Sequence, residues 1–215
     1  MKEVALFPIP NCVAFPGTVF PLHVFEPRYR QMVNYCLDNN VMMGITHTEE
    51  LISPAKRDQS LEEALNTNQA TYKPYTVFSA GKVALQETLQ DGRLLINVHL
   101  TDRLHAVEET QNLPFMIFQC ESYNDHEITI PVLEEANQLK QKILKRLIAL
   151  TSRSPQVSEM LQSDHWQTMD CVDFSFELFG LVQMSGDIRQ QILQCRSPVE
   201  RLNIALQLMN QTAQQ

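Results

Sequence analysis

The sequence lacks an apolar run of about eighteen residues, the length that a membrane-spanning helix requires. Its first ten residues, MKEVALFPIP, also lack the apolar segment and the small-residue cleavage site of a secretion signal. The five cysteines are scattered and never form a CxxC pair, which argues against a zinc site and against a disulfide framework. These absences predict a cytoplasmic protein whose thiols are reduced and mostly buried.

Signatures of catalysis are missing as well. Only six glycines occur, and Gly81-Lys82-Val83 lacks the earlier glycine and the following Ser or Thr of a phosphate-binding loop. The histidines form no HxxxH or HExxH pattern, and no GxSxG elbow is present. Glutamate pairs such as Glu134-Glu135 lie in polar segments or at an expected helix start, where solvated carboxylates are common. We therefore predict a protein that is not an enzyme and that uses no cofactor and no metal.

Positive charge is scarce. The 17 Lys and Arg residues against 25 Asp and Glu residues give a net charge of −8, which repels phosphate backbones unless the basic residues gather on one face. No stripe of alternating aromatic and basic residues provides such a face. Both features argue against nucleic acid as a partner. With 44% hydrophobic and 20% charged residues, the composition is otherwise that of a globular protein with a substantial core.

The first part of the chain has the pattern of β-structure, because short apolar runs alternate with turn residues over residues 1–124. Phe15-Pro16-Gly17-Thr18 fits a type II turn, and Asp91-Gly92 predicts a tight hairpin between two strands. The polar stretch from Glu49 to Lys73 predicts a long loop, with one helical turn at Leu61 to Leu65. We expect a mostly antiparallel sheet or barrel with at least one embedded helix.

The second part, residues 125–215, has a helical period. Apolar residues recur at steps of three and four over 136–150, which predicts an amphipathic helix. The run over 170–184 is apolar nearly all round, as in a buried helix, and Ser185-Gly186 is expected to end it. The fold class predicted from both parts is α+β, with a β-rich lobe at 1–124 followed by an all-α lobe at 125–215.

Two capping patterns mark the next helices of this lobe. Asp187 is expected to cap one helix, with Gln190 returning a hydrogen bond three residues later. Ser197 and Glu200 repeat the pattern, with Pro198 at the first helical position.

The stretch FPGTVFPLHVFEPRYRQMV combines a strand that is apolar on both faces with a charged helix start at Glu26-Pro27. One face of the strand belongs to the core. The other face, which carries Val19, His23 and Phe25, either packs on the helical lobe or lines a groove between the lobes that receives a ligand. In the second case aromatic residues contact an extended apolar segment, and an arginine at the rim orients a carbonyl or an acidic group. The candidate peptide-binding residues are His23, Phe25, Arg28, Tyr29 and Arg30.

The same stretch resembles the opening of the Lon protease N-terminal (substrate-binding) domain family. The family's F-P-G turn and its P-L-x-(I/V)-F-E-P-R-Y segment are similar to Phe15–Gly17 and to Pro21–Tyr29. The run from Gly81 to Glu108 resembles the family's hairpin, and the last helices resemble its closing helices. The likeness covers most of the chain.

This resemblance implies a PUA-like β pseudobarrel followed by a helical bundle. In Lon proteases the domain recognises substrates and assists ring assembly, ahead of an ATPase module and a serine–lysine peptidase. For this chain the resemblance implies a stand-alone, non-enzymatic module without either catalytic part, and it supplies no catalytic residue. The expected partners are apolar segments of unfolded or partner polypeptides, including those of a protease system. The alternative is a small-molecule or RNA-binding PUA-like domain.

Overall fold

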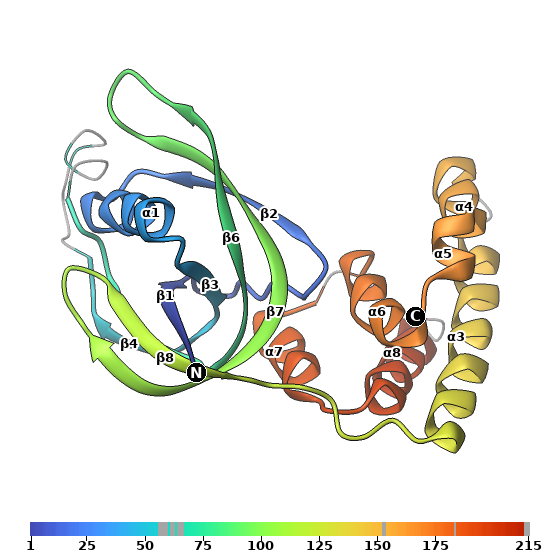
Figure 1. Ribbon diagram of the computed structural model, residues 1–215. Coiled ribbons are helices and arrows are strands. Elements are labelled where there is room, and N and C mark those ends of the chain that lie inside the picture. The colour runs from blue at the N-terminus through green and yellow to red at the C-terminus, as the bar shows by residue number, and fades with distance from the viewer. Residues whose placement is uncertain (56–59, 61–62, 64–66, 152–153, 183, 213–215) are drawn as a thin grey trace. The chain divides into compact units, whose positions relative to one another are not determined.

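The computed structural model describes residues 1–55, 60, 63, 67–151, 154–182 and 184–212 (Figure 1). The chain divides into two compact units. The β unit contains Met1–Tyr123 and Ser185–Leu193, and the helical unit contains Asn124–Met184 and Gln194–Gln215. The predicted division at residue 124 places residues 185–193 in the helical lobe, whereas here they group with the β unit.

A nearly closed sheet forms the frame of the β unit. Its strands are β1 (Lys2–Pro8), β2 (Val19–Val24), β3 (Met42–Thr46), β6 (Val77–Thr88), β7 (Leu94–Gln111) and β8 (Met116–Ser122). They lie in the order β2-β7-β6-β3-β1-β8, and β8 also pairs with β7. Five strands thus close a ring, while β2 stays outside it as an edge strand. The predicted α+β class with a barrel-like sheet is confirmed.

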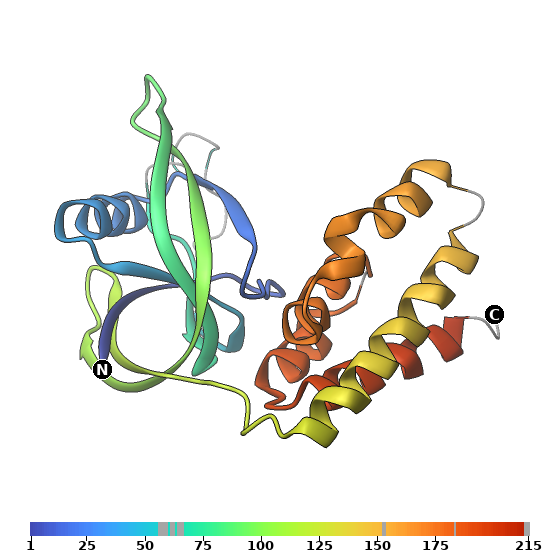
Figure 2. The same ribbon diagram turned by 45° about the vertical axis from the view of Figure 1, so that its right-hand side comes forward.

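The predicted hairpin at Asp91-Gly92 joins β6 and β7, and Figure 2 shows it projecting from the ring. Gly92 has a φ of 82°, and Gly17 in the predicted turn has a φ of 83°. Both values lie in the left-handed region that glycine tolerates best. These two turns are therefore confirmed where the local chemistry predicted them.

Helix α1 (Pro27–Asn39) begins at the predicted position. Glu26 is extended at the N-cap and Pro27 occupies the first turn, where its missing N–H costs no helical hydrogen bond. The helix buries Tyr29, Met32, Val33 and Cys36 in a cluster with residues of β1, β3 and β7. The charged cluster of the sequence is thus the start of a helix that covers the core of the ring.

We predicted a long loop from Glu49 to Lys73, but this stretch also contains β-structure. β4 (Thr48–Ser53) and β5 (Thr71–Pro74) form a separate two-stranded sheet at its ends. Neither strand has a buried face, so neither shows the apolar alternation that marks a strand in sequence. The predicted helical turn at Leu61 to Leu65 lies outside the described residues, apart from position 63.

The helical unit consists of α3 (Ile130–Leu150), α4 (Pro155–Gln162), α5 (Asp164–Thr168), α6 (Cys171–Glu177), a short 3-10 helix η1 (Leu178–Gly180) and α8 (Pro198–Thr212). The predicted amphipathic helix is confirmed in α3, which packs against α8. Ser197 precedes α8 as expected, since its hydroxyl accepts from the Glu200 amide at 3.5 Å. Among the described helices, none is long and apolar enough to cross a membrane.

The prediction of a single helix over residues 170–184 is wrong. α6 ends at Glu177 and continues only as η1, so Ser185-Gly186 does not close a helix. Gly186 instead begins α7 (Gly186–Gln194), and the Ser185 hydroxyl accepts from the Ile188 amide at 3.4 Å. The predicted cap at Asp187 is therefore displaced by two residues.

Polar contacts connect α7 to the rest of the β unit. The Gly186 amide donates to Asn11 Oδ1 at 2.7 Å, and Arg189 donates to the carbonyl of Val13 at 3.4 Å. The Gln190 side chain is buried and donates to the carbonyl of Val77 at 2.8 Å rather than returning to the helix start. Capping rules cannot show this, because these partners lie more than a hundred residues away in the sequence.

Candidate functional site

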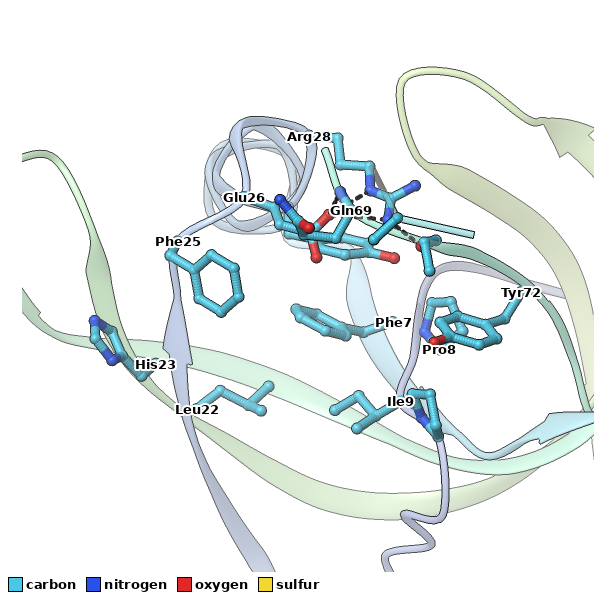
Figure 3. Close-up of a pocket in the computed structure, with 14 residues that line it drawn as sticks. Phe7, Pro8, Ile9, Leu22, His23, Phe25, Glu26, Arg28, Gln69 and Tyr72 are labelled. Atoms are coloured by element: carbon cyan, nitrogen blue, oxygen red, sulfur yellow. Dashed lines mark hydrogen bonds and ion pairs between the residues drawn. The ribbon is translucent and has the colours of Figure 1, made fainter. Parts of the chain in front are cut away.

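The β unit contains an apolar pocket of about 410 Å³ (Figure 3). This volume lies in the range of pockets that hold small ligands or side chains of a partner. Aromatic and aliphatic side chains make up most of its lining, with a polar group at one end. The lining residues are Phe7, Pro8, Ile9, Pro10, Leu22, His23, Phe25, Glu26, Arg28, Tyr29, Ala55, Gln69, Ala70 and Tyr72.

Two chain segments form opposite walls of the pocket. One is the end of β1, where Phe7 is followed by Pro8 and Pro10, which have no N–H to continue a strand ladder. The other is the end of β2. Figure 3 shows Leu22 opposite Ile9 and Phe25 turned toward Phe7, whereas His23 lies on the other side of the strand. The apolar surfaces of both segments therefore converge.

Tyr29 forms a buried wall of this pocket. Its ring stacks on Phe7, with the ring centroids 4.1 Å apart and the planes 20° apart. The side chain is 6% exposed, and burial raises the pKa of its hydroxyl to about 12. A phenol in this setting stays neutral at physiological pH, and Tyr29 acts as part of the core that shapes the pocket.

A polar clasp fixes the third wall. The Arg28 guanidinium donates to Glu26 Oε2 at 2.9 Å, to the carbonyl of Ala70 at 2.8 Å and to Thr71 Oγ1 at 3.2 Å. The amide of Gln69 donates to the same Glu26 oxygen at 3.0 Å. We call these four contacts the Glu26–Arg28 clasp. It ties residues 69–71, which lead into β5, to the start of α1.

The clasp changes the expected role of Arg28. We predicted an arginine at the rim that meets a bound segment, but the side chains of Arg28 and Glu26 are only 11% and 12% exposed. The guanidinium also lies over the Tyr29 ring, 4.6 Å from its centroid. Arg28 therefore positions the pocket wall.

The other binding residues that we predicted from the sequence fall into two groups, those that line the pocket and one that does not. His23, Phe25 and Tyr29 line the pocket with Arg28, whereas Arg30 is absent from the lining. Arg30 lies beside the hairpin tip, since a Cβ on Gly92 would meet its Nη1 at 2.8 Å. Every lining residue belongs to the β unit, so this pocket is not the groove between two lobes that we expected.

We expected the second face of β2 either to pack on the helical lobe or to line a groove, and the residues of β2 on this face are exposed. Val19 is 53% exposed, and Pro21 and His23 are exposed as well. Sequence reasoning also missed Phe7 and Tyr72 as pocket residues. The L-F-P-I-P run does indicate a strand ending in prolines, but nothing local connects it with residue 72.

A smaller cavity of about 140 Å³ adjoins the pocket. The two share Pro8, Arg28, Tyr29 and Tyr72 as lining residues. Ile52 and Leu113 also line the smaller cavity and are 63% and 80% exposed. Apolar surface therefore continues beyond Tyr72.

The family assignment rests on nearly the whole chain. Residues 3–211 match the sequence profile described as the ATP-dependent protease La (LON) substrate-binding domain. The chain belongs to this family. Over its length, the Lon substrate-binding domain is the one domain found, with no ATPase or peptidase domain. A search of curated proteins gives no match.

Solved structures show the same fold. The N-terminal domain of Mycobacterium avium complex Lon protease superposes with a TM-score of 0.70 at 14% identity, covering 97% of this chain and 98% of that one. A Lon N-terminal domain protein from Xanthomonas campestris has a TM-score of 0.56 at 19% identity, with 96% and 98% covered. At these identities the likeness establishes the Lon N-terminal domain fold of this chain.

The clasp gives a first prediction. Arg28→Ala should release residues 69–71 and lower the free energy of unfolding by about 1–3 kcal/mol, because buried acceptors lose their charged donor. Hydrogen exchange followed by mass spectrometry should show faster exchange in the segment that leads into β5. Arg30→Ala removes the same charge outside the clasp and is the control. Equal exchange of this segment in both variants would show that the clasp does not hold it.

Proposed function

We propose that this Lon substrate-binding domain binds extended apolar segments of unfolded or partner polypeptides in the pocket between β1, β2 and residues 69–72. The observation that carries the proposal is the convergence of Phe7, Leu22, Phe25 and Tyr72 on one open apolar pocket. The description of the family as substrate-binding supports it. The domain's role is recognition without catalysis, on cytoplasmic polypeptides that include those of a protease system.

The chemistry of the lining decides which ligand class fits. An apolar side chain that enters the pocket loses contact with water on several sides, which contributes about 25 cal/mol for each Å² buried. The cationic group at the pocket is already paired within the clasp, so it offers a phosphate or a carboxylate little additional binding. We therefore expect micromolar affinity, about −8 kcal/mol, with little dependence on salt.

Phe25 provides the direct test. It is half-buried, it lies beyond the end of β2 and its ring is turned into the pocket. Phe25→Ala should lower the affinity for a fluorescein-labelled peptide of alternating Leu and Ser by about tenfold or more, as measured by fluorescence anisotropy. The free energy of unfolding should fall much less than the 3–5 kcal/mol that is typical for a core phenylalanine.

The matched control is Leu85→Ala in β6. Leu85 is also an apolar residue of the β unit, 45% exposed, and it does not line the pocket. Its replacement should leave the anisotropy titration unchanged. Equal affinities of Phe25→Ala and Leu85→Ala for the peptide, or no binding by the unaltered protein, would refute the pocket as the binding site.

A further inference from the structure

β2 is the end strand of the six-stranded sheet and lies outside the ring. It pairs with β7 from Val19↔His99 to Val24↔Leu94, and the ring closes without it. On its other side, no strand in the described part of the chain pairs with it. The strand lies next to the pocket, since its residues Leu22 and His23 line the pocket, as does Phe25 directly after the strand.

The phase of the hydrogen bonds shows which backbone groups point outward. The Leu100 amide donates to the carbonyl of Thr18 at 2.9 Å, so the backbone of Thr18 faces β7. The N–H and carbonyl groups of successive residues point to opposite edges of a strand. The backbone groups of Phe20 and Leu22 therefore face β7 as well. Val19, Pro21 and His23 direct their N–H and carbonyl groups to the open edge. Pro21 fits this phase, because proline in a sheet has its nitrogen on the unpaired side.

The open edge thus presents a regular array of polar groups. It consists of the carbonyls of Val19, Pro21 and His23 and the amides of Val19 and His23, at residues that are all exposed. Donors and acceptors at this spacing are matched by the backbone of another extended chain. A strand lying beside β2 directs alternate side chains to the face that carries Leu22, which is the face of the pocket.

We infer that a bound polypeptide adds to β2 as a further strand and places alternate apolar side chains in the pocket. This inference rests on the proposed function and specifies its mode of recognition. The edge selects an extended backbone, and the pocket selects apolar side chains at every second position. Pro21 removes the central donor, which weakens indiscriminate pairing of this edge with other sheets.

A pair of substitutions at His23 tests the contribution of the backbone. His23→Pro and His23→Thr both remove the imidazole, but only the proline variant also removes the outward N–H. The proline variant should bind the labelled Leu/Ser peptide about threefold to tenfold more weakly than the threonine variant, the effect of one hydrogen bond. Proline is compatible with this position because Pro21 has the same phase in the same strand. Equal affinities of the two folded variants would overturn the inference.

N-methylated peptides give the same test on the unaltered protein, independent of any folding defect. Methylation of the alternate amides that face β2 should reduce affinity about tenfold or more. Methylation of the amides that face away from β2 should have a smaller effect. If the parent peptide binds and both methylated series bind equally well, strand addition is wrong while the pocket remains. If the parent peptide does not bind at all, the proposed function fails and this inference fails with it.

A second copy of the chain is the competing occupant of the edge. Analytical ultracentrifugation of the unaltered protein and of the two His23 variants distinguishes it. Self-association that is lost in His23→Pro, together with peptide affinity that is equal in both variants, would assign the edge to β2–β2 pairing and overturn the inference. A monomer with phase-dependent peptide binding supports it.

Discussion

Asp125→Ala is expected to lower the free energy of unfolding of the helical unit by about 3–5 kcal/mol, the usual cost of breaking a buried ion pair. Its partner Arg201 is fully buried, and the guanidinium donates to the two Asp125 oxygens at 2.7 and 2.6 Å. The same side chain donates to Ser175 Oγ at 2.8 Å and lies 3.9 Å from the centroid of the Phe176 ring. Without Asp125, a buried positive charge loses its counter-charge.

Chemical denaturation measures this effect, and two further variants define its cause. Asp125→Asn keeps the shape and one acceptor, so it should fall between the unaltered protein and Asp125→Ala. Adding Arg201→Met to Asp125→Ala should recover part of the loss, because the charge that needs a partner is then absent. Glu159→Ala, at an exposed site in α4, should change stability by less than about 0.5 kcal/mol. A similarly small change in Asp125→Ala would show that the pair does not hold the unit together.

Tyr29→Ala should destabilise the β unit by about 3–5 kcal/mol, as expected for a core aromatic. The ring is buried in the cluster that joins α1 to the sheet, and it stacks on Phe7. This loss also removes part of the pocket wall, so we expect the proposed peptide binding to fall together with stability. Phe25→Ala should separate the two effects, because Phe25 is half-buried and lies outside that cluster.

Tyr29→Phe is the matched control for this second prediction. It keeps the stacked ring and removes only the hydroxyl, so its free energy of unfolding should stay within about 1.5 kcal/mol of the unaltered protein. Guanidinium titrations of all three variants provide the comparison. Comparable losses in Tyr29→Ala and Phe25→Ala would mean that both rings are scaffold, and would leave the pocket without its proposed contact residue.

Local chemistry accounts for the elements that could be predicted from the sequence. Gly17, Gly92 and Pro27 each have a conformational requirement that their neighbours reveal, so the two turns and the start of α1 are found where expected. The motif around Phe25 also led to residues that line the pocket. In that motif the strand end and the helix start are adjacent in sequence as well as in space.

The remaining features depend on contacts between distant segments. Arg28 has the appearance of a rim residue until Ala70 and Thr71 are placed beside it, and these two residues follow a polar stretch without periodicity. β4 and β5 have no buried face to produce a pattern. α7 has an ordinary amphipathic sequence, and only its partners Asn11 and Val77 show which unit it joins.

α7 also determines how this chain can be divided. The backbone passes between the two units after Tyr123, after Met184 and after Leu193, so neither unit is a continuous piece of sequence. A fragment that stops at residue 124 would leave Asn11, Val13 and Val77 without the groups that α7 brings to them. The β unit of this protein is therefore encoded in two separate stretches, and exchanging it with that of a relative requires both stretches to be transferred together.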